Sequence, residues 1–131
     1  MKSGTIFAIL ILGSYAGLEA YTIRKASDRM EPAYIHKLLV EAKVATELCK
    51  SSALELEDRF ARTLQRATES YRKDLRANDS AVSEQAISQQ IDQQVDSASV
   101  AATEAVNAQG CSHPDSKAQF QRYRIYAKKT R

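Results

Sequence analysis

The residue types that could carry out chemistry in this chain gather in one segment, Cys111-Ser-His113-Pro-Asp115. It offers a thiol, an imidazole and a carboxylate, which are the groups used in zinc sites and in nucleophilic catalysis. A structural zinc site needs about four such ligands, and no second ligand pair accompanies these three. The other histidine, His36, stands among charged neighbours, and we expect it at the surface. The pattern therefore predicts no catalytic residue, no metal site and no cofactor.

The cysteines are better explained by a structural bridge. Cys49 and Cys111 are the two cysteines of the chain, and in an exported protein such a pair favours a disulfide. Oxidation would also remove the thiolate on which a metal site or a nucleophile at Cys111 depends. The alternatives are two unpaired thiols or a bridge between two chains. We expect an intrachain disulfide that contributes about 4 kcal/mol on the chain-entropy model.

The N-terminal residues indicate export. Residues 1–20 place Lys2 before the apolar run 5–12 and end in small residues at two acceptable cleavage sites, which is the order of a secretory signal peptide. A membrane-spanning helix needs about 20 mostly apolar residues, and Glu19 interrupts this segment first. We expect a cleaved signal peptide, and the alternative is an uncleaved anchor. Both place the remainder outside the cytoplasm, periplasmic or secreted, after a short charged linker at residues 21–31.

The composition favours an all-α fold, because Gly and Pro are scarce and helix-forming residues dominate. Pro32 suits the first turn of a helix, and no Gly or Pro interrupts the chain from there to Ala77. This stretch, at 1.5 Å per residue, would make a rod of about 67 Å. Its apolar or small residues recur at steps of three and four, at Leu38, Ala42, Ala45, Cys49, Ser52, Leu56, Phe60, Leu64, Ala67, Tyr71 and Leu75.

A second helix is expected from Ala81 to Ala108. Asn78-Asp79-Ser80 is a turn and N-cap cluster, and Gly110 suits the left-handed residue past a helix end. The stretch 83–99 is rich in Gln, Ser and Ala, and disorder is the alternative there, but its apolar spacing favours a helix. The apolar seam of this helix consists of Val82, Ile87, Ile91, Val95, Ala98, Ala102 and Ala105.

Residues 32–111 are therefore predicted to form a long, antiparallel, coiled-coil-like hairpin. Folding the chain back at the turn pairs Leu75 with Val82, Tyr71 with Ile87, Ala67 with Ile91, Phe60 with Ala98 and Leu56 with Ala102. The same register sets Cys111 opposite Glu47, two residues from Cys49. The hairpin thus brings the cysteines together, although they were not used to set its register.

Residues 112–131 are predicted to be a basic, aromatic tail, or a short third helix from Ser116 to Lys128 that would make a small bundle. Between Arg76 and Lys117 the chain has six acidic residues and no Lys or Arg. The tail could lie on an anionic membrane surface, bind nucleic acid or pair with an acidic protein surface. Export makes nucleic acid the weakest of these partners, and a purely solubilising tail is the alternative. The candidate binding residues are Phe120, Arg122, Tyr123, Arg124, Tyr126, Lys128 and Lys129.

These features favour a non-enzymatic interaction or structural protein of the cell envelope, which associates with a protein partner or with itself through the helical seam. If the N-terminal segment is an anchor, the chain is a membrane-tethered periplasmic rod. That layout resembles the layout of phage inner-membrane spanins, and the resemblance implies action at membranes in host lysis. The third hypothesis is a small exported enzyme or metal carrier that uses Cys111, His113 and Asp115, and it requires a reduced Cys111.

Overall fold

The structure, a computed structural model, describes residues 31–129, and these residues form helices without any strand. One compact unit of the chain begins at Pro32. Its helices are α2 (Pro32–Leu48), α3 (Leu54–Asn78), α4 (Glu84–Gln109) and α5 (Pro114–Lys129). The all-α class is confirmed, and so is the third helix near the C-terminus, which here is α5.

The predictions for the N-terminal part concern other residues. The signal peptide or anchor at residues 1–20, and the linker at 21–31 apart from its last residue, lie outside the described range and stay predictions. Among the described helices, none is both long and apolar enough to cross a membrane.

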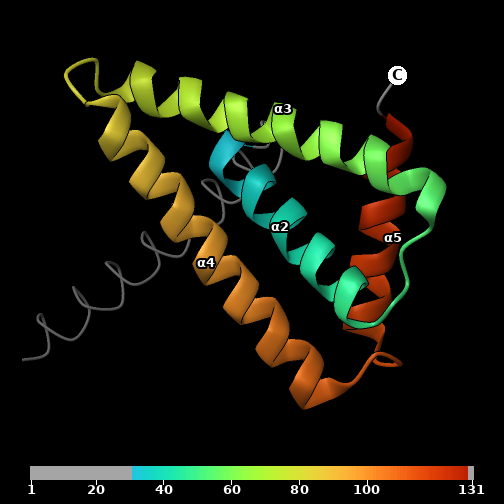
Figure 1. Cartoon of the computed structure of the whole chain (residues 1–131). Helices are drawn as coiled ribbons and strands as arrows, with labels where there is room; N and C mark the ends of the chain where they lie inside the picture. The colour runs from blue at the N-terminus through green and yellow to red at the C-terminus, as the bar shows by residue number, and fades with distance from the viewer. Residues whose placement is uncertain (1–30, 130–131) are drawn as a thin grey trace, which may run out of the picture. The chain divides into compact units, whose positions relative to one another are not determined.

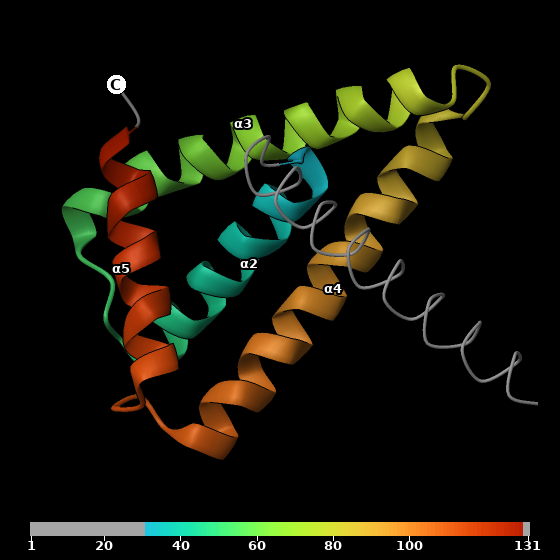
Figure 2. The same ribbon diagram turned by 180° about the vertical axis from the view of Figure 1, so that it is seen from behind.

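α2 lies in the middle of this unit. α3 and α4 diverge from their connecting turn, and α5 runs between their far ends, so the three helices form the sides of a triangle (Figures 1 and 2). α2 runs inside the triangle and contacts each of the three. The apolar core is therefore organised around α2 instead of along one seam between two helices.

The predicted continuous helix from Pro32 to Ala77 is wrong, because α2 ends at Leu48 and α3 begins at Leu54. The N–H of Ser51 donates to the carbonyl of Thr46 (2.9 Å) and the N–H of Lys50 to that of Glu47 (3.1 Å). These two bonds form a Schellman cap, which places Lys50 in the left-handed region at φ 52°. A non-glycine residue there loses about 1–2 kcal/mol.

The break also removes the extended rod. The longest described helix has 26 residues, so the rod of about 67 Å expected from the continuous seam does not form. The chain instead folds α2 back between α3 and α4. This rearrangement allows one short helix to bury side chains against three neighbours.

The hairpin prediction holds near its turn. Tyr71 on α3 and Ile87 and Ile91 on α4 form one buried cluster, with Leu75 and Val82 packed against it. The folded-back register pairs Tyr71 with Ile87 and Leu75 with Val82, whereas Ala67, its partner for Ile91, packs in the other cluster. α4 starts slightly later than expected, where the side chain of Ser83 accepts a hydrogen bond from the N–H of Ala86 (3.1 Å). It ends at Gln109 and is followed, as predicted, by Gly110, whose φ is 85°.

Away from the turn the predicted pairing is wrong. Phe60, which the register set against Ala98, stacks instead on Tyr123 of α5, with ring centroids 4.1 Å apart. Leu39 is 1% exposed and belongs to the same cluster as these two rings, whereas the predicted seam residue Leu38 is only half-buried. The physical reason is the insertion of α2, which separates α3 from α4 and becomes the main neighbour of α4.

Candidate functional site

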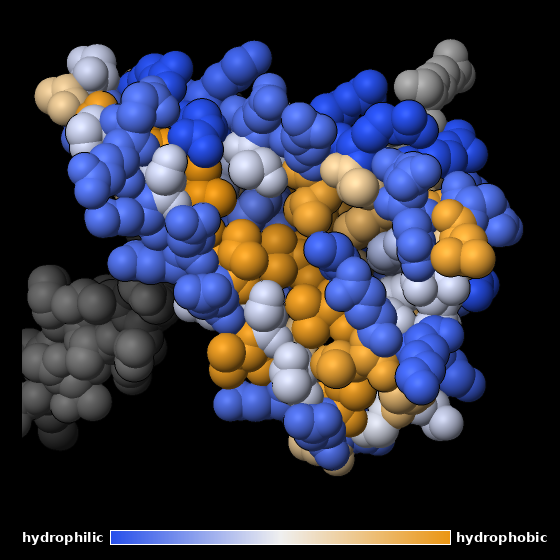
Figure 3. Space-filling view, viewed as in Figure 1, coloured by the Kyte–Doolittle hydropathy of each residue, from blue (hydrophilic) through white to orange (hydrophobic). Residues whose placement is uncertain are grey.

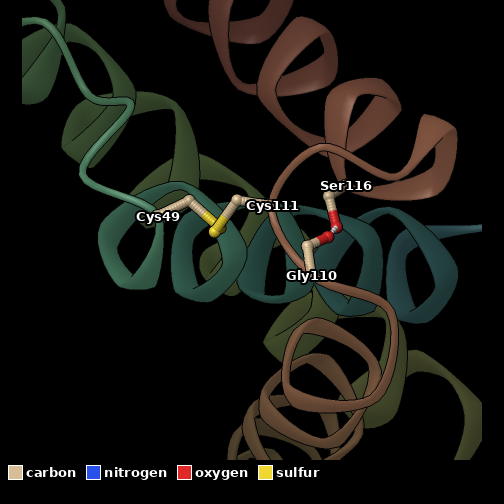
Figure 4. The surroundings of a disulfide bond; sticks show 4 residues. All are labelled: Cys49, Gly110, Cys111 and Ser116. Carbon is tan, nitrogen blue, oxygen red and sulfur yellow. Dashed lines mark hydrogen bonds between the residues drawn. A yellow bond between two sulfur atoms is a disulfide. The ribbon is translucent and has the colours of Figure 1, made fainter.

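The Cys49–Cys111 disulfide is formed, as predicted, with the two Cα atoms 5.7 Å apart. Cys49 follows the last residue of α2, and Cys111 lies in the connection between α4 and α5, so the bridge ties the central helix to the surrounding helices (Figure 4). The bridged residues are 62 apart in the sequence. Both lie toward the solvent side of the fold, since Cys49 is half-buried and Cys111 is exposed. The bridge therefore constrains the chain more than it fills the core.

The connection beside the bridge is held by two hydrogen bonds to one carbonyl. Ser116 is buried on the first turns of α5, and its Oγ donates to the carbonyl oxygen of Gly110 at 2.8 Å (Figure 4). The backbone N–H of His113 donates to the same oxygen at 3.3 Å. The end of α4 and the start of α5 are thereby fixed next to the disulfide.

The segment singled out for chemistry has a structural role in this fold. Cys111 has no thiolate, because its sulfur is bonded to that of Cys49. The Nδ1 atom of His113 accepts a hydrogen bond from the N–H of Asp115 (3.1 Å) and so caps the start of α5. Within residues 31–129, no group of three or more His, Cys, Asp or Glu side chains is arranged to hold a metal ion.

His36 is not at the surface, which corrects the prediction made from its charged neighbours. Its side chain is 1% exposed on α2, and its Nδ1 lies 2.8 Å from Nε2 of Gln94 on α4. The amide of Gln94 also donates to the carbonyl of Ala33 (2.9 Å), and the imidazole packs against the ring of Tyr71 with centroids 5.4 Å apart. Since an amide nitrogen only donates, Nδ1 is the acceptor and the imidazole is neutral. Burial lowers the pKa of His36 below its ordinary value near 6.5.

A signal for this burial was present in the sequence. The stretch that forms α2 has apolar residues on nearly all sides, which is typical of a helix enclosed by others. The predicted stripe through Leu38 leaves out the buried residues Leu39, Val40 and Thr46, which lie beside it on the helix. His36 belongs to this enclosed side because it precedes Leu39 by three residues and Val40 by four.

The aromatic residues predicted to bind a partner are mostly packed against the fold. Tyr123 is buried against Phe60, and burial, with the nearby charges of Glu57 and Glu47, raises the pKa of its hydroxyl. Phe120 and Tyr126 are half-buried. These rings hold α5 in place, so they do not form an open aromatic surface.

The cations of the same set point outward. Arg124, Lys128 and Lys129 are exposed, and the ammonium of Lys129 lies 4.9 Å from the ring centroid of Tyr126. Arg122 is half-buried and donates to the side chain of Gln119 at 2.8 Å. The predicted binding set is thus divided by the helix into inward aromatic residues and outward basic ones.

Comparisons with protein-family models, with curated proteins and with solved structures found no match to this chain. The candidate functional surface is therefore defined by the chain's own residues. Figure 3 shows apolar residues gathered where α2 runs between α3 and α4, with hydrophilic residues around them. Five large apolar side chains are well exposed on the described residues: Tyr34, Leu48, Leu54, Val100 and Ile125.

The disulfide is predicted to supply a large part of the stability of the fold. Replacing Cys49 and Cys111 together by Ser should lower the free energy of unfolding by about 4 kcal/mol, because the unfolded chain regains the freedom that a long closed loop denies it. Urea unfolding followed by circular dichroism measures this difference. Reductant should shift the curve of the native protein and leave that of the double variant unchanged. An unchanged curve for the reduced native protein would contradict the prediction.

Stability is also predicted to fall in mild acid. The buried His36 stays neutral in the folded chain, whereas in the unfolded chain it takes up a proton below pH of about 6.5. Protons therefore favour the unfolded state, and the free energy of unfolding should decrease as pH drops from that value, by at most about 1.4 kcal/mol per pH unit. Urea unfolding between neutral pH and pH of about 5 measures the slope.

Two single variants assign this pH dependence. His36→Gln removes the titrating group and keeps an acceptor for Gln94, so it should flatten the slope. Gln89→Ala, at an exposed residue on α4, removes no ionisable group and should leave the slope as it is. An equally steep slope in His36→Gln would show that another group is responsible.

Proposed function

We propose that this chain is a non-enzymatic interaction protein of an oxidising compartment, exported to the periplasm or secreted, whose helices present a binding surface to another protein. The observation that carries the proposal is the Cys49–Cys111 disulfide, which joins the central helix to the helices around it. Structural disulfides persist in exported proteins and are rare where thiols are kept reduced. The bridge therefore supports export of the chain.

The small core supports the same proposal. Five of the twelve buried apolar residues within the described range are alanines: Ala42, Ala45, Ala98, Ala102 and Ala127. Alanines bury little area, so packing alone holds these helices less strongly than large side chains would. Small domains with thin cores use disulfides to reach adequate stability. In a disulfide-linked helical unit of this kind, the outer faces of the helices are held in fixed positions, which suits them to binding.

The residues that could support catalysis have structural roles in this fold, which favours a binding function over an enzymatic one. Cys111 is oxidised, the imidazole of His113 caps a helix, and the imidazole of His36 is enclosed by α3 and α4. On the outer faces of α4 and α5, in contrast, Val100 and Ile125 are more than half exposed. Protein-binding surfaces combine apolar side chains with a surrounding polar rim, and each of these residues has charged neighbours on its helix.

Cross-linking in intact cells tests the proposal. A photoreactive phenylalanine analogue in place of Val100 or Ile125, in the chain produced with its own N-terminal segment, should form a protein-sized adduct on irradiation. The same analogue in place of Lys73, an exposed residue on α3, is the matched control and should form little. Alkylation before and after reduction reports the thiols in the same sample, and both cysteines should react only after reduction.

Two results would contradict the proposal. One is adduct formation at Val100 and Ile125 that does not exceed the amount at Lys73. The other is alkylation of both cysteines before reduction, because a protein with free thiols in its native compartment is not stapled there.

A further inference from the structure

The solvent face of α4 carries an acidic stripe. Its members recur every four residues, so they lie along one ridge of the helix, and all are exposed: Asp92, Asp96, Val100 and Glu104. Val100 is 56% exposed and lies in a shallow, open depression together with Asp96 and Glu104. α4 contains no Lys or Arg, and within residues 31–129 none of the three acids forms a salt bridge. The ridge is therefore an uncompensated acidic surface with one apolar side chain.

The solvent face of α5 carries a basic stripe with the same spacing. Its members are exposed as well: Lys117, Gln121, Ile125 and Lys129. Ile125 is 53% exposed, and α5 has five Lys and Arg residues against one acid. Arg124 and Lys128, both exposed, add to the positive charge beside Ile125. This ridge repeats the pattern of the α4 ridge with the opposite sign of charge.

The two ridges correspond position by position. When the helices are set parallel with the two apolar residues in contact, the facing pairs are Asp92 with Lys117, Asp96 with Gln121, Val100 with Ile125 and Glu104 with Lys129. Two ridges made of residues four apart can interdigitate side by side. All eight side chains are exposed within one chain, so the complementary ridges do not contact each other there.

We infer that the partner of this surface is a second copy of the same chain, in which α4 of one copy docks against α5 of the next. The inference rests on the proposed function and names its protein partner. A two-fold pair would form the contact twice. Single exposed ion pairs contribute little, so the association is weak and depends on the ionic strength.

Charge reversal tests the inference in the oxidised full chain. In low salt, sedimentation should give a mass above that of the 14.6 kDa monomer. It should approach the monomer mass near 0.5 M salt, where charges more than about 4 Å apart are screened. Asp92→Lys with Glu104→Lys makes both ridges basic, and Lys117→Glu with Lys129→Glu makes both acidic. Each double variant should be monomeric, because like charges then face each other.

Mixing the two double variants is the decisive step. An equimolar mixture should associate again, since every basic ridge then meets an acidic one, and the chain with all four reversals should associate by itself. Arg62→Glu with Arg66→Glu on the exposed side of α3 changes the charge as much as the α5 variant does. This control should keep the association of the native chain. Circular dichroism confirms that each variant is folded.

Other occupants predict different results. If residues 1–30, with Arg24, Lys25 and Arg29, covered α4, the native chain would be monomeric and the α5 variant would behave like it, which overturns the inference. A mixture that stays monomeric overturns it as well. Either result leaves the proposed function standing when the Val100 adduct has the mass of a different protein. Free thiols, or the absence of adducts at Val100 and Ile125, would contradict the proposed function itself, on which this inference rests.

Discussion

The enclosure of α2 by three other helices is the constraint on which the rest of the structure depends. Leu39, Ala42 and Ala45 are almost fully buried, and each position needs a neighbour from α3, α4 or α5. The enclosure also buries two polar side chains, His36 and Thr46. His36 is accommodated by the amide of Gln94, whereas the hydroxyl of Thr46 has no hydrogen-bond partner among the described residues. A central helix with these side chains is stable only while its neighbours stay in place.

The disulfide acts on the same constraint. α2 is short, and without a bridge it could leave the space between α3 and α4 when those helices separate. Cys49 attaches the end of α2 to Cys111, beside the hydrogen bonds that fix Gly110 to the start of α5. One bond therefore restrains α2, α4 and α5 together. The packing around α2 and the disulfide at the connection between α4 and α5 restrain the fold. The outer ridges of α4 and α5 therefore remain available for contact with another molecule.

Local signals accounted for part of this fold. Gly110 follows the end of α4 as predicted, and the packing of Tyr71 on Ile87 follows from the tight turn between α3 and α4. The N-cap of α4 is Ser83, beyond the predicted Asn78-Asp79-Ser80 cluster. The break at Lys50 had no such signal, because a lysine fills the left-handed position that glycine usually occupies. The burial of His36 depends on contacts with Tyr71 and Gln94, which lie far along the chain. Tertiary packing decided both features, and spacing along a single helix does not report it.

The candidate site shows the same division. The pairing of Cys49 with Cys111 could be predicted from the expected export of the chain and from the folded-back register. That register, however, matches the structure only near the turn between α3 and α4. The outward cations of α5 were expected, whereas the inward position of Tyr123 follows from its stacking on Phe60. A sequence of alternating basic and aromatic residues is the same whether its rings bind a partner in solvent or pack in a core. Only the position of the helix relative to its neighbours distinguishes these two roles.

The unfolding free energies of Leu39→Ala and Leu38→Ala test the central position of α2 most directly, because the enclosed helix and the continuous hairpin predict opposite orders for these neighbouring residues. Leu39 is 1% exposed and Leu38 is half-buried, so the structure predicts a loss of about 2–5 kcal/mol for Leu39→Ala and a clearly smaller loss for Leu38→Ala. Leu54→Ala, at a residue that is 82% exposed, provides the baseline. A loss at Leu38 that equals or exceeds the loss at Leu39 would contradict the enclosure of α2.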